Sequence, residues 1–359
     1  MSVLYILIGI LMFGVLIAVH EAGHFGVSKL FHIKVNEFSI GMGPALWHKD
    51  RGETQYSLRL LPIGGFCAIE GEDGESDDPR SFTKKPIWQR ICVLAAGSAT
   101  NLFTGFLIAL IIYMGYAFSG DYVLPNARLT GFMEGFPLES AEGLQVGDRI
   151  VSVDGWKVNS TRDFSLFMSV SDGESVDLVV KRDGKKIHLD DFPLTLREYT
   201  DEAGNTVLKY GLYFDQTPLT VGAALREACY DVAYYARVVW VSLKFLFSGK
   251  AGVSDLSGPV GMVKAISDAG TEAASVKEGL SNVFTLIAFL AVNLAVMNML
   301  PIPALDGGHI FSMLIFWCIE KLIGRKPSPK IETYIHAAGL ILLLMLMAFV
   351  MFNDVRKLI

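Results

Sequence analysis

The segment "VHEAGHF", residues 19–25, carries the side chains best suited to chemistry: His20, Glu21 and His24 form the pattern H-E-x-x-H. On a helix, residues i and i+4 share one face, so both imidazoles can bind one metal ion, with Glu21 beside them as general base. A catalytic zinc takes three protein ligands and one water, whose pKa falls to about 7. The motif therefore predicts a Zn²⁺ site that activates water and needs one more ligand, although several divalent ions suit such donors.

The motif follows eighteen uncharged residues, "SVLYILIGILMFGVLIAV". A carboxylate within a membrane span costs about 2.5–3.5 kcal/mol on insertion scales, so it rarely persists without a partner. A five-residue pattern can arise by chance, but a chance pattern would not explain a buried charge. His24 precedes Lys29 by five residues, about 7 Å of helix, so we expect the site within the bilayer, near one surface.

The third ligand is predicted to be Asp306, in "NMLPIPALDGGHIF". It is the only acidic residue between Glu278 and Glu320. The prolines and glycines around it would break a regular helix, which is tolerated at membrane depth where the chain lines a protein-enclosed cavity. The alternative is that Asp306 caps a helix that resumes at Gly307. We favour the ligand, because the buried motif and the broken helix would otherwise be coincidences.

The remaining histidines are weaker candidates. His309 follows Asp306 closely and is interpreted as a hydrogen-bond partner behind the ligands or an interfacial histidine, rather than a fourth ligand. Four others have no partner at a useful spacing and are interpreted as ordinary: His32, His48, His188 and His336.

The composition indicates a membrane protein with substantial soluble parts. The 359 residues are 52% hydrophobic and 19% charged, whereas soluble proteins are nearer a quarter charged. A net charge of −6 with mixed signs gives no reason to expect nucleic acid binding. The four cysteines are scattered without a C-x-x-C pair, so neither a disulfide framework nor a thiolate zinc site is expected.

About four segments are long and apolar enough to span a membrane: 3–30, 91–120, one within 279–305 and 333–353. The first has no basic residue before it and no A-x-A-like site after it, so we expect a retained span rather than a cleaved signal peptide. Lysine and arginine concentrate in 31–90 and 320–332, which predicts that both loops are cytoplasmic. Residues 121–278 and both termini are then extracytoplasmic.

Two regions outside the spans have recognisable patterns, one of strands and one of a helix. Within 31–90, "VNEFSIGMG" and "TQYSLRLLPIGGFCAIEG" predict strands with glycine-rich turns just behind the motif. Residues 221–247 mix charges and aromatic side chains at helical spacing, which predicts an amphipathic helix on the outer membrane surface within the linker 196–278. The alternative, a fifth span, would separate the two metal-ligand motifs in depth.

The chain resembles the site-2 protease family of intramembrane zinc metalloproteases, and in particular its PDZ-containing bacterial branch of RseP-type regulators of sigma-E protease. "HEAGH" and "NMLPIPALDGG" match the two family motifs, and similar stretches include "FSIGMGPALW", "LPIGGFCAIEGED", "SFTKKPIWQRICVLAAGSATN" and "LSGPVGM". One departure is "GSATN", where the family often has proline after the glycine.

This resemblance implies His20, His24 and Asp306 as zinc ligands and Glu21 as catalytic acid/base. It also implies that Asn293 and Asn298 lie near the substrate, and we expect Pro301 and Pro303, in the same segment before Asp306, to contact the substrate as well. The segment 31–90 would hold a β-hairpin or small sheet that pairs with an extended substrate, the alternative being an inert cytoplasmic loop.

Residues 126–195 resemble a PDZ domain. "GFMEGFPLESAEGLQVGDRIVSVDGWKVNS" is interpreted as a loop, a short helix ending at Gly143, and a strand with its turn. Strands follow in "SVDLVVKRDGKKIHL", with a hairpin signal at Asp183-Gly184. Such a domain either binds a peptide ligand by strand addition or excludes substrates with large ectodomains.

The fold class expected is a multi-pass α-helical membrane protein with a small membrane-associated β-sheet and an inserted extracytoplasmic PDZ domain. The function expected is an endopeptidase of the bacterial inner membrane that cleaves spans of single-span proteins, an anti-sigma factor or signal-peptide remnants. A metal transporter or sensor would use the same ligands without needing Glu21 as base. An inactive scaffold would have no reason to carry buried charges.

Overall fold

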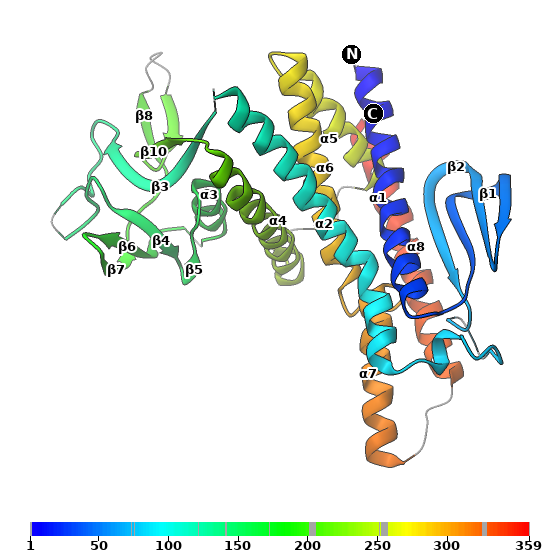
Figure 1. The fold of residues 1–359 in the computed structure, drawn as a ribbon. Helices are drawn as coiled ribbons and strands as arrows, with labels where there is room; N and C mark the ends of the chain where they lie inside the picture. The colour runs from blue at the N-terminus through cyan, green and yellow to red at the C-terminus, as the bar shows by residue number, and fades with distance from the viewer. Residues whose placement is uncertain are drawn as a thin grey trace. The chain divides into compact units, whose positions relative to one another are not determined.

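Long apolar helices and two separate strand-bearing regions form the chain in the computed structural model (Figure 1). The structure describes residues 2–72, 74, 76–120, 122–140, 142–171, 173–200, 206–250, 252, 258–324 and 329–358. Parts of four predictions fall outside these residues: Asp73 of "IEGED", Ala141 of the predicted short helix, Leu256 and Ser257 of "LSGPVGM", and basic Arg325 and Lys326. Two compact units are present, Tyr113–Tyr230, here the sheet unit, and Met1–Ile112 with Asp231–Ile359, here the helical unit.

The helices are α1 (Ser2–Leu30), α2 (Ile87–Ser119), α3 (Thr161–Val170), α4 (Val221–Ser248), α5 (Pro259–Thr271), α6 (Val276–Asn298), α7 (Asp306–Ile323) and α8 (Pro329–Leu358). Among the described residues, four helices are long and apolar enough to cross a membrane: Val3–Leu30, Ile87–Ser119, Val276–Asn298 and Ile331–Lys357. The four predicted spans are therefore confirmed as helices of suitable length and composition.

The helical segment 279–319 is broken before Asp306, as the prolines and glycines there predicted. Helix α6 ends at Asn298, the chain turns through 299–305, and α7 begins at Asp306. Helix α5 was not predicted. It packs with α1 and α6 through a cluster that includes Tyr5, Ile266 and Ile287.

Helix α4 matches the predicted helix 221–247 and is not among the four candidate spans. Its C-terminal part packs Tyr235 against Ala288 and Val292 of α6. Whether it lies on the membrane surface stays a prediction.

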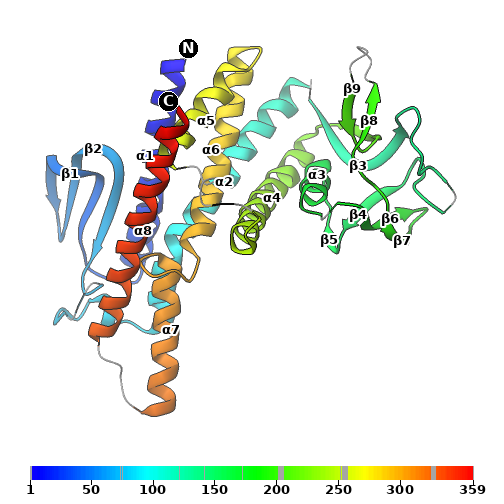
Figure 2. The same ribbon diagram turned by 180° about the vertical axis from the view of Figure 1, so that it is seen from behind.

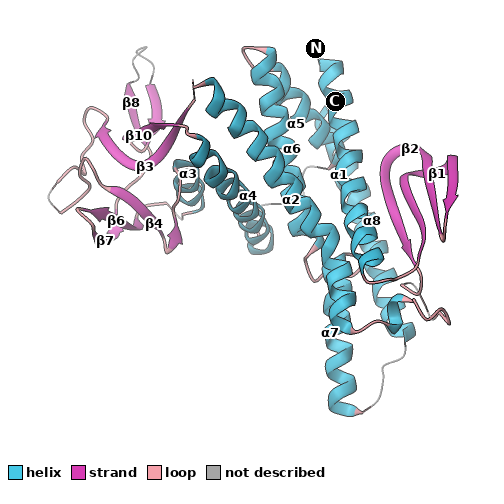
Figure 3. Ribbon diagram, in the orientation of Figure 1, coloured by secondary structure: helices cyan, strands magenta, loops and turns pink. Residues whose placement is uncertain are grey.

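The strands of the helical unit, β1 (Val35–Arg51) and β2 (Thr54–Ile69), form an antiparallel sheet beside α1 (Figure 3). Both strands bend, so β1 pairs twice with β2: Phe38 lies opposite Tyr56 on one side and Cys67 on the other. Residues 35–40 are therefore an inner run, 65–69 form one edge, and 45–51 form the opposite edge. The predicted small sheet is present, with this additional fold-back.

The sheet is anchored at the end of α1 and on α2. Ile33, Val35 and Cys67 share a buried cluster with Val93 of α2 and Met313 of α7. At the far turn, Lys29 Nζ donates to Glu53 Oε1 over 2.7 Å, and this bond holds the pKa of Glu53 below its usual value, with help from Arg80. The cluster ties the sheet to the same helices that carry the histidines and the aspartate.

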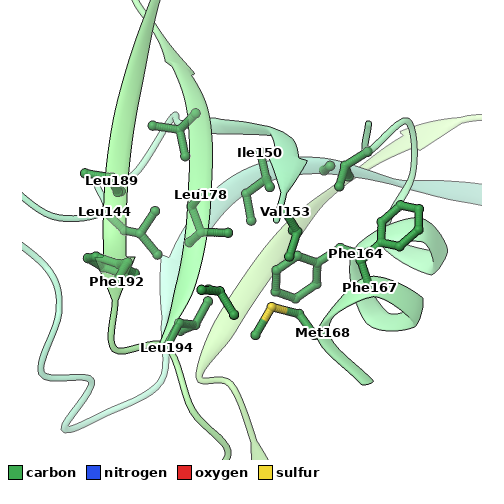
Figure 4. Packing of buried hydrophobic residues seen from close by; sticks show 14 of the residues in the cluster. Leu144, Ile150, Val153, Phe164, Phe167, Met168, Leu178, Leu189, Phe192 and Leu194 are labelled. Atoms are coloured by element: carbon green, nitrogen blue, oxygen red, sulfur yellow. The ribbon is translucent and has the colours of Figure 1, made fainter. Parts of the chain in front are cut away.

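The sheet unit is built on an antiparallel sheet with the order β10-β3-β4-β6-β7, with β5 paired to β4. Its strands are β3 (Val123–Phe132), β4 (Arg149–Val153), β5 (Trp156–Lys157), β6 (Val176–Arg182), β7 (Lys185–Phe192) and β10 (Leu212–Pro218); β8 (Arg197–Thr200) pairs with β9 (Thr206–Lys209). Ile150, Val153 and Leu178 from the strands meet Phe164 and Phe167 of α3 in one core (Figure 4).

Two details of this region differ from the sequence prediction. The short helix ending at Gly143 is wrong: the described residues of 133–148 form turns and one bridge between Glu139 and Leu144. Leu144 N–H bonds back to Leu138 O, six residues earlier, whereas an α-helix would bond it to the residue four positions back. The sheet also extends past residue 195, because β10 returns to pair with β3. The hairpin at Asp183-Gly184 is confirmed, with φ of 48° and 83°.

We expect Leu178→Ala to destabilise the sheet unit by about 2–5 kcal/mol, because Leu178 is fully buried among strands and helix. Amide hydrogen exchange of peptides from β4 and β6, in the full chain in detergent, measures this loss. Leu196→Ala is the matched control, since Leu196 is 52% exposed, and should change exchange little. Equal exchange in both variants would contradict the core assignment.

Candidate metal centre

Helix α1 brings the two motif histidines to one face, and the start of α7 brings Asp306 to them. His20 Nε2 and His24 Nε2 lie 3.2 Å apart. Asp306 Oδ2 lies 3.2 Å from His20 Nε2 and 3.5 Å from His24 Nε2. Both histidines are buried, so three residues from two motifs 282 positions apart converge in one interior site.

The three donor atoms fit a tetrahedral metal ion. Zinc bonds of about 2.0–2.1 Å at tetrahedral angles separate neighbouring ligand atoms by about 3.3 Å, close to the three distances found. Asp306 Oδ2 is buried without a hydrogen-bond partner. A buried carboxylate oxygen without a partner is costly, and a cation between the three residues would satisfy it.

The other ring nitrogens of the histidines have partners that fix the rings. His24 Nδ1 lies 2.8 Å from Val93 O, so it donates to that carbonyl and leaves Nε2 free for a metal. Asn101, fully buried, places its amide 3.1 Å from His20 Nδ1, with Nδ2 nearest and Oδ1 unpartnered. Turning this amide by half a rotation lets Oδ1 accept from His20 Nδ1–H, which orients His20 in the same way.

Helix α2 leaves room for the site at Gly97. A Cβ there would lie 2.4 Å from His24 Nε2 and 2.7 Å from His20 Nε2. Directly before His24, a Cβ on Gly23 of α1 would lie 2.5 Å from Ala96 O of α2. Small residues on both helices thus let α1 and α2 approach closely enough for Val93 and Asn101 to reach the rings.

The loop before Asp306 folds back on the start of α7. A Cβ on Gly307 would lie 2.3 Å from Met299 O, and one on Gly308 would lie 2.1 Å from Ile302 O. Only glycine permits this approach. Leu305 is the N-cap residue, and no side-chain cap hydrogen bond is present there, so the geometry gives no support to Asp306 as a helix cap.

Glu21 lies next to the three donors without being one of them. It interacts electrostatically with His20, His24 and Asp306, and the backbone N–H of Cys67 donates to its carboxylate. The sheet edge 65–69 therefore runs past Glu21, where a Cβ on Gly65 would lie 3.6 Å from Glu21 Cγ. A base and an extended strand edge meet beside the donor cluster.

The residues predicted to contact substrate lie at different places in the structure. Asn298 lies at the cluster, with Nδ2 3.2 Å from His20 Nε2. Pro303 packs against α8 at Gly339. For Asn293 and Pro301, substrate contact stays a prediction. Gly97 and Asn101 were not predicted from the sequence, where "GSATN" stood out only as a departure from the family pattern. The available signal was a glycine and a polar asparagine within a largely apolar span.

Comparison with known proteins supplies the family. The model for peptidase family M50 matches residues 8–346. The chain belongs to peptidase family M50, the site-2 proteases. A Clostridium acetobutylicum protein, named as a zinc metalloprotease by inference, is 34% identical over 357 residues, which cover 99% of this chain and 98% of the relative. A similarly named Fusobacterium nucleatum protein is 36% identical over 356 residues, covering 98% of each chain.

The regulator of sigma-W protease RasP of Bacillus subtilis is 28% identical over 430 residues, covering 97% of each chain. This M50 peptidase is therefore a zinc metalloprotease and an integral membrane protein, as its composition and motifs predicted. Its buried imidazole and carboxylate donors are of the kinds that zinc takes in catalytic sites.

We expect Gly97→Ala to remove zinc binding and peptidase activity from this M50 peptidase, because the new methyl group would occupy the space beside both Nε2 atoms. Zinc per chain, by elemental analysis after dialysis, and cleavage of a model substrate measure the effect. Gly115→Ala on the same helix is the matched control, since nothing lies within 4 Å of its added Cβ. Retained zinc in Gly97→Ala would place the metal elsewhere.

Proposed function

We propose that this M50 peptidase is an intramembrane endopeptidase that cleaves the membrane-spanning segment of single-span proteins. The observation that carries the proposal is the convergence of His20, His24 and Asp306, with Glu21 beside them, on apolar helices. In this proposal the first three hold zinc and Glu21 is the catalytic acid/base. Helix α1, which carries the motif, is itself a candidate span.

The proposed location is the bacterial inner membrane, with the catalytic site near the cytoplasmic side. The basic residues of 31–90 and those after α7 support cytoplasmic loops. Lys29, one turn or so beyond His24, ends α1 on that side, so about 7 Å of helix separates the motif from the surface. The same topology makes 121–278 extracytoplasmic.

The chemistry proposed is hydrolysis of a peptide bond by water. Zinc, when bound, polarises the scissile carbonyl and acidifies the attacking water. Glu21 takes the proton from that water and delivers it to the leaving amine nitrogen. The N–H of Cys67 orients the Glu21 carboxylate, and Asn101 and Val93 keep His20 and His24 in the ring orientation that presents Nε2.

A substrate span must be unwound first, because a helix hides each peptide carbonyl in a backbone hydrogen bond. The edge 65–69 supports a way to do this. Among the described residues, run 35–40 pairs with one side of the edge 65–69. No strand of these residues pairs with the other side of that edge, which faces Glu21. An extended substrate strand paired there would lie beside the metal donors. Asn298, and by the family resemblance Asn293, would bind the released backbone groups.

Exposed apolar side chains on the sheet support contact with the bilayer or an apolar substrate. Ile40, Met42, Trp47, Leu58 and Leu61 are each exposed. A soluble sheet would present a polar outer face, whereas this one resembles a surface that meets lipid.

The sheet unit is proposed to be an extracytoplasmic PDZ domain. The strands β4, β6 and β7 lie where the resemblance expects them, and α3, which the sequence analysis did not predict, begins with a capping box between Ser160 and Asp163. It would bind a peptide end by strand addition or exclude large ectodomains. The name of RasP refers to sigma-W regulation, which supports an anti-sigma factor as substrate; signal-peptide remnants are the other candidate.

We expect Glu21→Gln to lower cleavage at least about 100-fold, since general acid–base catalysis contributes about that much or more, while zinc content stays unchanged. Purified wild-type and variant proteins in detergent are incubated with a single-span model substrate. Mass spectrometry locates the cut, and elemental analysis counts the metal.

A cut within the span by the wild type alone, with equal zinc, supports the proposal. Zinc in both proteins without cleavage of any of several substrates would instead favour a metal transporter or sensor. Loss of zinc in Glu21→Gln would contradict its assignment as a base outside the ligand set.

The edge-pairing proposal predicts a local change in hydrogen exchange. When the single-span substrate is added to Glu21→Gln, amides of 65–69 should exchange more slowly, because they gain a strand partner. The opposite edge, 45–51, serves as an internal control and should not change. Protection of 45–51 without 65–69 would place the substrate on the other edge of the sheet.

A further inference from the structure

A histidine interpreted from the sequence as ordinary holds the loop that carries Asp306. His336 of α8 is 9% exposed, and its Nδ1 accepts a hydrogen bond of 3.0 Å from the N–H of Ala304. Ala304 lies two residues before Asp306, in the loop between α6 and α7. In Figure 2 this loop lies against α8.

Ala304 is held in a conformation that it would not adopt readily by itself. Its φ is +74°, in the left-handed region that a residue with a Cβ disfavours. Such a conformation persists when its surroundings determine it. The bond to His336 fixes the Ala304 N–H, and one turn further along α8, Gly339 packs so closely on Pro303 that a Cβ would lie 2.4 Å from Pro303 Cβ.

The ring of His336 is itself fixed from several sides. Because Nδ1 accepts a hydrogen bond, Nε2 carries the proton of the neutral ring and donates to Ser312 Oγ over 3.2 Å. Ser312 Oγ also lies 3.0 Å from Glu332 Oε1. The His309 ring stacks on His336 with centroids 3.7 Å apart and an interplanar angle of 3°. The loop is thus bound to a rigid group of side chains from α7 and α8.

The same group has the composition of a metal site. His309, Glu332 and His336 offer ligand atoms within 4.8 Å of one another. The parallel stack argues against chelation, since a ring nitrogen binds a metal in the plane of its ring and one ion cannot lie in two parallel planes. Both nitrogens of His336 also lie at hydrogen-bond distance from other groups. A hydrogen-bonded network describes the geometry better.

We infer that His336 is a positioning residue for the zinc site: through the Ala304 N–H it fixes the loop that directs the Asp306 carboxylate toward His20 and His24. This inference rests on the proposed function, in which Asp306 is a zinc ligand. The sequence LDGG supplies the carboxylate and the tight turn. The α8 histidine determines where that turn lies.

Three variants of the full-length protein test the role: His336→Ala, His336→Asn and His336→Gln. Asparagine places its Oδ1 near the position of Nδ1 and can still accept from Ala304, whereas glutamine places its amide nearer the position of Nε2. The measurements are zinc affinity by chelator competition, kcat and KM on the single-span substrate, and hydrogen exchange of 299–308 in zinc-free protein. His188→Ala, at an exposed position of the sheet unit, is the surface control.

We expect His336→Ala to bind zinc roughly 10- to 100-fold more weakly, as for other residues that orient metal ligands. The value of kcat should fall while KM changes little, and 299–308 should exchange faster even without zinc. His336→Asn should recover affinity and slow exchange more than His336→Gln does. Wild-type affinity and exchange in His336→Ala would overturn the inference, as would equal losses in all three variants that follow their melting temperatures.

The variant Asp306→Ala tests the proposed zinc ligand set separately from the positioning role of His336. If Asp306→Ala keeps its zinc, the proposed ligand set fails. If Asp306→Ala loses zinc and His336→Ala does not, the ligand set stands and the role of His336 fails. Two zinc ions per wild-type chain, one of them lost in His336→Ala, would also overturn the inference and make the α7–α8 group a metal site.

Discussion

Two imidazoles and a carboxylate buried among apolar helices impose the constraint on which the helical unit depends. None of these groups is favourable inside a membrane protein without a partner. Their donor atoms converge to within 3.2–3.5 Å, in a geometry that a cation can satisfy. The neighbouring elements allow these atoms to meet. Gly97 of α2 leaves room beside the two imidazoles, and the loop before α7 folds back so that Asp306 reaches them.

Helix α2 contributes no metal donor to the cluster, yet the site depends on it. It supplies a carbonyl for His24 and an amide for His20, and its small residues allow α1 to approach. Ligands whose outer nitrogens are fixed in this way present a defined lone pair to the metal. Two of the three donors come from α1 and the third, Asp306, comes from the start of α7, so the contacts from α2 fix the two rings that α1 supplies.

The bent sheet connects metal chemistry to substrate handling. Because run 35–40 is enclosed between two runs of β2, the edge 65–69 is pushed toward α1, where Cys67 contacts Glu21. In the proposed function one short strand would orient the base and align the peptide to be cut. The buried cluster of Ile33, Val35, Cys67 and Val93 keeps that strand registered with the helix that carries the ligands.

The sequence by itself determined the elements and the chemical groups. Local patterns sufficed for this: apolar length gives the spans, the i, i+4 spacing puts His20 and His24 on one face, and prolines with glycines break the helix before Asp306. Only the tertiary structure decided which distant groups support them. Asn101, Gly97 and His336 act through contacts with residues 32 to 81 positions away, and no local periodicity encodes such contacts. The short helix expected before Gly143 is replaced by turns, in which Leu144 N–H bonds to Leu138 O and Gly143 O accepts from the distant Arg182.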